Sequence, residues 1–257
     1  MVIDADLCAG CGSCEIYCPV EAIVVTKKKT AKGKEIRAVD LAQCVECGNC
    51  LRADICPVRA IAQQALEWPR SIRSAFSNPQ TEHKSRDMGR GTEEMKTNEI
   101  THRFRDGEVG IALELGRPLL GAGFRDVDRV TRAMAQIGVE FEANNPLTAL
   151  LEDPSRGIMK KDILDERVLS TIVEFKIPED KLDAVLLAIR DVAETLDSVF
   201  SLDVIHRLPR GKSDPLPDRI RQLGFDVRPN GKVNLGLGRP IPNDTRPGPA
   251  GRAGRSA

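Results

Sequence analysis

Eight cysteines lie within the first 56 residues of this chain of 257 residues, and none follows them. They form two copies of one spacing, each closed by a Cys-Pro pair. The first copy is Cys8-x2-Cys11-x2-Cys14-x3-Cys18-Pro19, and the second is Cys44-x2-Cys47-x2-Cys50-x5-Cys56-Pro57. Runs of this kind hold [4Fe–4S] clusters, and in two-cluster proteins the cysteine before the proline ligates the other cluster. The sequence therefore predicts two [4Fe–4S] clusters.

This crossed ligation divides the cysteines into two sets of four. The first cysteine set is Cys8, Cys11, Cys14 and Cys56, and the second cysteine set is Cys18, Cys44, Cys47 and Cys50. Each set offers the four thiolates that one cubic cluster needs. Segments 18–23 and 56–61 also resemble each other, and this internal repeat supports one common design for the two halves.

Two other uses of cysteine compete with this interpretation. A disulfide framework requires an oxidising compartment, whereas residues 1–6 show neither the basic nor the apolar region of a signal peptide. Zinc sites combine two Cys-x2-Cys pairs, and a triplet with a trailing Cys-Pro does not fit that pattern. Oxygen-sensitive clusters and reduced thiols predict a cytoplasmic protein.

Residues 1–66 resemble the bacterial-type two-[4Fe–4S] ferredoxins through these cysteines and Cys-Pro pairs. The resemblance implies a small α+β domain that carries single electrons at low potential. The chain departs from the family at residues 51–55, where three residues are usual, and between the repeats. The longer segment between the repeats predicts a β-hairpin, with strands over 23–26 and 35–39. Its tip is either simply solvated or a docking patch for an acidic partner, and it carries Lys27, Lys28, Lys29, Lys32 and Lys34.

Charge and hydropathy exclude two classes of partner. The chain has 38 basic and 38 acidic side chains, so it lacks the basic excess of a nucleic-acid-binding protein. No apolar stretch reaches the roughly 18 residues that a membrane-spanning helix needs. We therefore expect neither nucleic-acid binding nor a membrane span.

Beyond the cysteine-rich domain at 1–68, the pattern predicts a second domain. Residues 69–98 lack periodicity and indicate a linker or contact loop. Within 99–208, strands are predicted over 108–115, 139–142, 168–177 and 199–205, with helices starting near Asp126 and after Pro178, and 144–161 irregular. Two βαβ units predict an α+β protein whose second domain is a ferredoxin-like α/β sandwich. A helix over 214–223 and a hairpin over 225–237 form an extension at 209–238, and 239–257 is predicted to be disordered.

No catalytic residue is predicted, because the chain shows no nucleophile elbow, metal-binding histidine pair or dinucleotide fingerprint. A Lys-Thr pair at 96–97 hints at a phosphate loop, but Met95 stands where that motif needs glycine. The whole layout, with the loop 90–98, resembles the iron–sulfur half of 6-hydroxynicotinate reductase-type proteins. That resemblance implies a partner oxidoreductase subunit, for which a flavin is one option, and a redox donor protein.

Three hypotheses for the function follow from these patterns. The first is an electron-transfer subunit that passes low-potential electrons to a partner reductase. The second is a redox or metabolite sensor in which residues 99–208 bind a small effector. The third is a complete ferredoxin-domain reductase. The sequence names neither the electron donor nor the acceptor, and it gives no oligomeric state.

Overall fold

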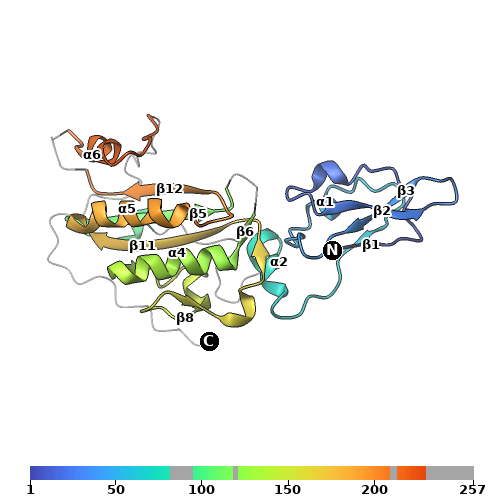
Figure 1. The fold of residues 1–257 in the computed structure, drawn as a ribbon, viewed down its shortest axis with the longest axis horizontal. Helices are drawn as coiled ribbons and strands as arrows, with labels where there is room; N and C mark the ends of the chain where they lie inside the picture. Colours follow the sequence, from blue (N-terminus) through green and yellow to red (C-terminus); the bar gives the residue numbers. More distant parts are fainter. Residues whose placement is uncertain (82–94, 118–120, 209–212, 230–257) are drawn as a thin grey trace.

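A computed structural model describes residues 1–81, 95–117, 121–208 and 213–229. These residues form two lobes that meet beside a short helix, α2 (Ser71–Ser77) (Figure 1). The first lobe holds all eight cysteines, and the second lobe is built on a four-stranded sheet. The predicted order of a cysteine-rich segment followed by a mixed helix-and-sheet segment is therefore present.

Short strands tie the first lobe together at its ends and across its middle. Strand β1 (Val2–Ile3) pairs antiparallel with β4 (Ile61–Ala62), which joins the beginning of the lobe to its end. Strand β2 (Ile23–Lys29) pairs antiparallel with β3 (Glu35–Val39). The predicted hairpin is thus confirmed, although its first strand extends three residues further and includes three lysines. The lobe also contains a 3-10 turn, η1 (Glu15–Tyr17), and a one-turn helix, α1 (Asn49–Arg52).

The sheet of the second lobe has the strand order β12-β5-β11-β7, and all neighbouring strands are antiparallel. Its members are β5 (Glu108–Leu115), β7 (Glu140–Phe141), β11 (Thr171–Pro178) and β12 (Phe200–Ile205). Three of these strands fall where the alternation of apolar residues predicts them. The fourth predicted strand, at 168–177, begins too early, because the chain joins this sheet only at Thr171. The Leu169 N–H donates to the Ser77 hydroxyl of α2 at 2.8 Å, and the preceding β10 (Arg167–Val168) pairs with β6 (Ala122–Gly123).

Two helices pack against each other and supply the apolar core of the second lobe (Figure 1). Helix α4 (Phe124–Ile137) starts two residues before the position predicted for it and ends at Gly138, whose φ of 76° suits glycine. Helix α5 (Leu182–Ala193) follows β11 after the 3-10 turn η4 (Glu179–Lys181). Alternate residues of β5, such as Ile111 and Leu113, are fully buried in the same core.

The other face of the sheet is covered by the segment 95–104, which includes α3 (Asn98–Thr101). A side chain at Gly110 would lie 2.9 Å from the Phe104 ring and 3.2 Å from Met95, so this cover fits closely. Lys96 forms ion pairs with Glu114 and, at 2.9 Å, with Asp203. This face therefore combines two apolar contacts with paired charges.

Helix α2 corrects the prediction of an irregular connection after Pro69. Ile72 and Phe76 are each 3% exposed and belong to the core of the second lobe. The Phe76 ring meets the Phe124 ring edge-on, with centroids 6.1 Å apart. One apolar pair, four residues apart, is too short a pattern to stand out as a helical period, which is why the prediction failed.

The remaining elements are short. They are η2 (Thr148–Leu150), β8 (Leu151–Asp153), β9 (Ile158–Met159), η3 (Lys161–Ile163) and α6 (Leu216–Gln222). Helix α6 confirms the helix predicted over 214–223, and the β8–β9 pair lies in the segment predicted to be irregular. Residues 225–229 contain no strand, contrary to the predicted hairpin. Residues 230–237, the predicted tail at 239–257 and most of the predicted loop 90–98 lie outside the described residues.

Candidate metal centre

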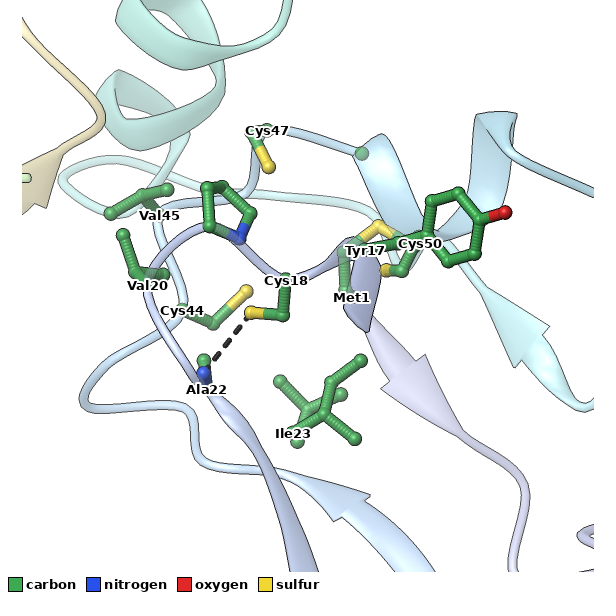
Figure 2. A pocket seen from close by; sticks show the side chains of 13 residues that line it. Met1, Tyr17, Cys18, Val20, Ala22, Ile23, Cys44, Val45, Cys47 and Cys50 are labelled. Carbon is green, nitrogen blue, oxygen red and sulfur yellow. Dashed lines mark hydrogen bonds between the residues drawn. The ribbon is translucent and has the colours of Figure 1, made fainter. Parts of the chain in front are cut away.

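The second cysteine set lines one cavity in the first lobe (Figure 2). Cys18 follows η1, Cys44 and Cys47 precede α1, and Cys50 lies in α1. The rest of the lining is mostly apolar and consists of Met1, Tyr17, Pro19, Val20, Ala22, Ile23, Val39, Val45 and Gly48. One cavity thus collects a cysteine of the first sequence motif and three cysteines of the second motif.

The thiols of this set are close enough to influence one another electrostatically. Burial raises the pKa of Cys50 to about 11, and nearby Cys47, Cys44 and Cys18 act in the same direction. Burial also raises the pKa of Cys44 and of Cys47. Iron binding requires thiolates, so loading this set must release the protons that burial retains.

The first cysteine set is more open to solvent. Burial raises the pKa of Cys14, and the charges of Cys11 and Cys8 raise it further. Cys11 is exposed, and hydrogen bonds from Ser13 lower its pKa. Cys56 packs beside the small core of the first lobe. Its membership of the first set remains a prediction from the spacing.

In both Cys-Pro segments, a backbone N–H group donates a hydrogen bond to the cysteine sulfur. The Ala22 N–H donates to Cys18 Sγ at 3.1 Å, and the Ala60 N–H donates to Cys56 Sγ at 3.2 Å. The residue before each alanine has a left-handed backbone, with φ of 53° at Glu21 and 51° at Arg59. Such hydrogen bonds stabilise a thiolate and help to set the reduction potential of a cluster. The sequence did not predict these hydrogen bonds, because neither Glu nor Arg indicates a left-handed backbone conformation.

The two extra residues of the second motif lengthen a turn. The first motif forms the 3-10 turn η1 between Cys14 and Cys18, whereas the second motif forms the α-helical turn α1. Asp54, with φ of 46°, then redirects the chain toward Cys56. The two extra residues of the second motif are therefore accommodated as a helical turn followed by a left-handed residue.

Buried charges fix the loop that leads into the second set. Arg73 of α2 donates to the carbonyl oxygens of Leu41, Ala42 and Cys44, at 3.0, 3.1 and 2.8 Å respectively. The same guanidinium forms an ion pair with Glu166 of the second lobe. One side chain therefore joins the loop before Cys44 to the other lobe, and nothing in the local sequence pattern pointed to it.

A second buried group lies between two cysteines of this set. The Glu46 side chain is fully buried and accepts a hydrogen bond of 2.6 Å from Arg70, and it also contacts the amino group of Met1. Burial would raise the pKa of Glu46, but the hydrogen bonds from these two cations lower it overall. Glu46 therefore stays ionised and holds the loop between Cys44 and Cys47 in place.

The residues of the second cysteine set fit an iron–sulfur cluster. A cubic cluster takes four thiolates at separate corners. The cavity lined by four cysteines, together with the backbone N–H of Ala22 that donates to Cys18 Sγ, matches that requirement.

The difference in exposure predicts the order in which iron is lost. When the loaded protein meets an iron chelator in air, we expect two phases, with about half of the iron leaving in the fast phase. The fast phase should belong to the first set, because Cys11 is exposed whereas Cys44 is 7% exposed. The measurement is iron release followed by absorbance. Cys11→Ala should abolish the fast phase alone, and loss of the slow phase instead would reverse our assignment.

Comparison with known proteins agrees with this chemistry. Residues 7–60 match the family of 4Fe-4S dicluster domains, and this segment contains all eight cysteines. It is a ferredoxin-type, metal-binding segment, and the match supports iron–sulfur electron transfer. No curated protein and no solved structure matches the chain. Among the helices of the described residues, none has the length and apolar character to cross a membrane.

Proposed function

We propose that this chain is the electron-transfer component of an oxidoreductase and that each cysteine set holds one [4Fe–4S] cluster. The cavity lined by Cys18, Cys44, Cys47 and Cys50 is the observation that carries the proposal, because it unites cysteines of both motifs. A bound cluster of this type supplies one-electron transfer at a potential set by charge, hydrogen bonds and exposure. The chain contributes the thiolates, the N–H donors to sulfur and the buried Arg73 beside the second set.

The contacts between the lobes suggest a direction for the electrons. Arg73 donates to the carbonyl of Cys44, and it also pairs with Glu166 of the second lobe. A side chain at Gly121 of the second lobe would lie 3.5 Å from Val20, close to Cys18. The second set therefore borders the second lobe. We infer that electrons enter at the first set and leave through the second set.

The second lobe is the proposed attachment point for the partner. Its strand order, with two helices between the strands, supports a ferredoxin-like α/β sandwich of the kind predicted from sequence. The partner that we infer is a reductase subunit, of which the 6-hydroxynicotinate reductase type is one example. This role accounts for a second lobe that is larger than a free electron carrier needs.

Anaerobic purification of native complexes tests this function. We expect a partner oxidoreductase subunit to co-purify, and we expect chemically reduced wild-type chain to transfer electrons to it. Cys47→Ala, which removes one ligand of the second set, should still bind the partner but should reduce it far more slowly. The proposal fails if the reduced wild-type chain passes no electrons to any protein that co-purifies with it.

A further inference from the structure

One group of positive charges in the first lobe lies on a single exposed hairpin. The lysine tip, which we define as Lys27, Lys28, Lys29, Lys32 and Lys34, lies on the β2–β3 hairpin, and all five residues are exposed. Residues 27–34 contain no Asp or Glu. Within the described residues, none of these five lysines forms an ion pair with a carboxylate. Five positive charges are therefore held together on one hairpin and face solvent.

This concentration of charge contrasts with the rest of the chain. Subtracting the five lysines of the tip from the 38 basic side chains leaves 33, against 38 acidic ones. The rest of the chain thus has a net negative charge, whereas the lysine tip is positive. A partner that bears negative charge is attracted to the tip.

The lysine tip also lies against the loop of the first cysteine set. A side chain at Gly10, between Cys8 and Cys11, would lie 2.9 Å from Cβ of Lys34 and 2.7 Å from the carbonyl oxygen of Glu35. Cys11, on the same loop, is exposed. The β2–β3 hairpin lies at the end of the first lobe away from the second lobe (Figure 1). The lysine tip therefore lies beside the exposed first cysteine set and not beside the enclosed second set.

Apolar side chains also flank this set. Leu7, directly before Cys8, is 53% exposed, and Ile16, shortly after Cys14, is 85% exposed. Isolated exposed apolar residues need no explanation. Here, however, Leu7 and Ile16 lie beside an exposed cysteine loop and a charged tip. Protein–protein interfaces combine an apolar centre with a polar rim in this way.

We propose that the lysine tip is the docking surface for an acidic protein that donates single electrons to the first cysteine set. The proposal rests on the electron-transfer function proposed above and names the charge of the donor. In the reaction that this docking serves, one electron leaves the donor, which is oxidised, and reduces the iron–sulfur protein. No bond forms or breaks.

The test measures binding rather than turnover and uses the iron-loaded full chain. The probe is a small acidic flavodoxin. Titration calorimetry at low ionic strength should show binding of flavodoxin. Lys28→Glu with Lys32→Glu should weaken flavodoxin binding at least about tenfold, because two attractions become repulsions. At about 1 M salt the difference should vanish, since charges are then screened within roughly 3 Å.

Two further variants test whether the loss of flavodoxin binding is specific to the charge of the lysine tip. Arg156→Glu with Lys161→Glu introduces the same change of charge on exposed residues of the second lobe, and it should leave the affinity unchanged. Lys28→Arg with Lys32→Arg should bind like the wild type. The docking proposal is overturned if the wild type does not bind flavodoxin in a salt-dependent way, or if the two Glu pairs weaken binding equally.

A failure of docking can be told apart from a failure of the proposed function. Iron content and reduction by photoreduced deazaflavin, a small electron donor, are measured on the same samples. A chain without iron, or with iron that cannot be reduced, contradicts the electron-transfer function itself. A chain that is loaded and reducible, but whose lysine pair can be reversed without effect on flavodoxin binding, contradicts only the docking surface.

Discussion

Replacing Cys18 by alanine is expected to remove the cluster of the second motif and to leave that of the first motif, although Cys18 belongs to the first motif in sequence. The physical reason is the shared cavity, which Cys18 lines together with Cys44, Cys47 and Cys50. Iron content should fall from about eight to about four atoms per chain, since one cubic cluster holds four. The measurement is iron and sulfide analysis of protein purified without oxygen.

Double variants decide which cluster was lost. If Cys18 and Cys47 bind the same cluster, the double alanine variant should keep about four irons, the same as either single variant. If Cys18 and Cys11 bind different clusters, their double variant should lose nearly all iron. The opposite pattern, with iron lost from the Cys18 and Cys47 pair and retained by the Cys18 and Cys11 pair, would contradict the crossed assignment.

Replacing Arg73 by alanine is expected to cause a large loss of stability. Its side chain is 6% exposed, pairs with Glu166 and donates to three carbonyl oxygens of the loop before Cys44. Removing one partner of a buried ion pair costs about 3–5 kcal/mol, because the remaining charge is left without compensation. Native domains are stable by only about 5–15 kcal/mol. The measurement is anaerobic denaturant unfolding of the iron-loaded protein.

Arg125 provides the matched control for this prediction. It also forms an ion pair, with Asp165 at 2.6 Å, but the two side chains are 61% and 82% exposed. Exposed pairs contribute about 0–1 kcal/mol, so Arg125→Ala should be nearly neutral. Glu166→Gln should destabilise the protein less than Arg73→Ala, since the carbonyl contacts of Arg73 remain. Equal effects of the two arginine changes would show that Arg73 does not join the lobes.

The elements that sequence predicted best are those with a strong repeating pattern. Strand β5 alternates buried apolar residues such as Ile111 and Leu113 with others over eight residues, and helix α4 repeats Val127, Val130 and Met134 at helical spacing. Each pattern is long enough to define its own period. The cysteine spacing was informative for a different reason, since few binding sites other than iron–sulfur clusters require it.

The features that sequence did not reveal depend on contacts between distant residues. Arg73 reaches carbonyl groups about 30 positions earlier in the chain, and no local pattern distinguishes it from a surface arginine. Helix α2 is set by the burial of Ile72 and Phe76 in a core formed by later residues. The left-handed residues Glu21 and Arg59 are stabilised by the turn that delivers an N–H to sulfur. Tertiary contacts thus override local preference at these positions.

The most direct test of this account is a combined count of iron, sulfide and reducible centres in the anaerobically purified chain. The account predicts about eight iron and about eight sulfide per chain, and no stoichiometric zinc. Stepwise reduction followed by electron paramagnetic resonance should then reveal two one-electron centres. About four iron with a single reducible centre, or bound zinc in place of iron, would contradict it.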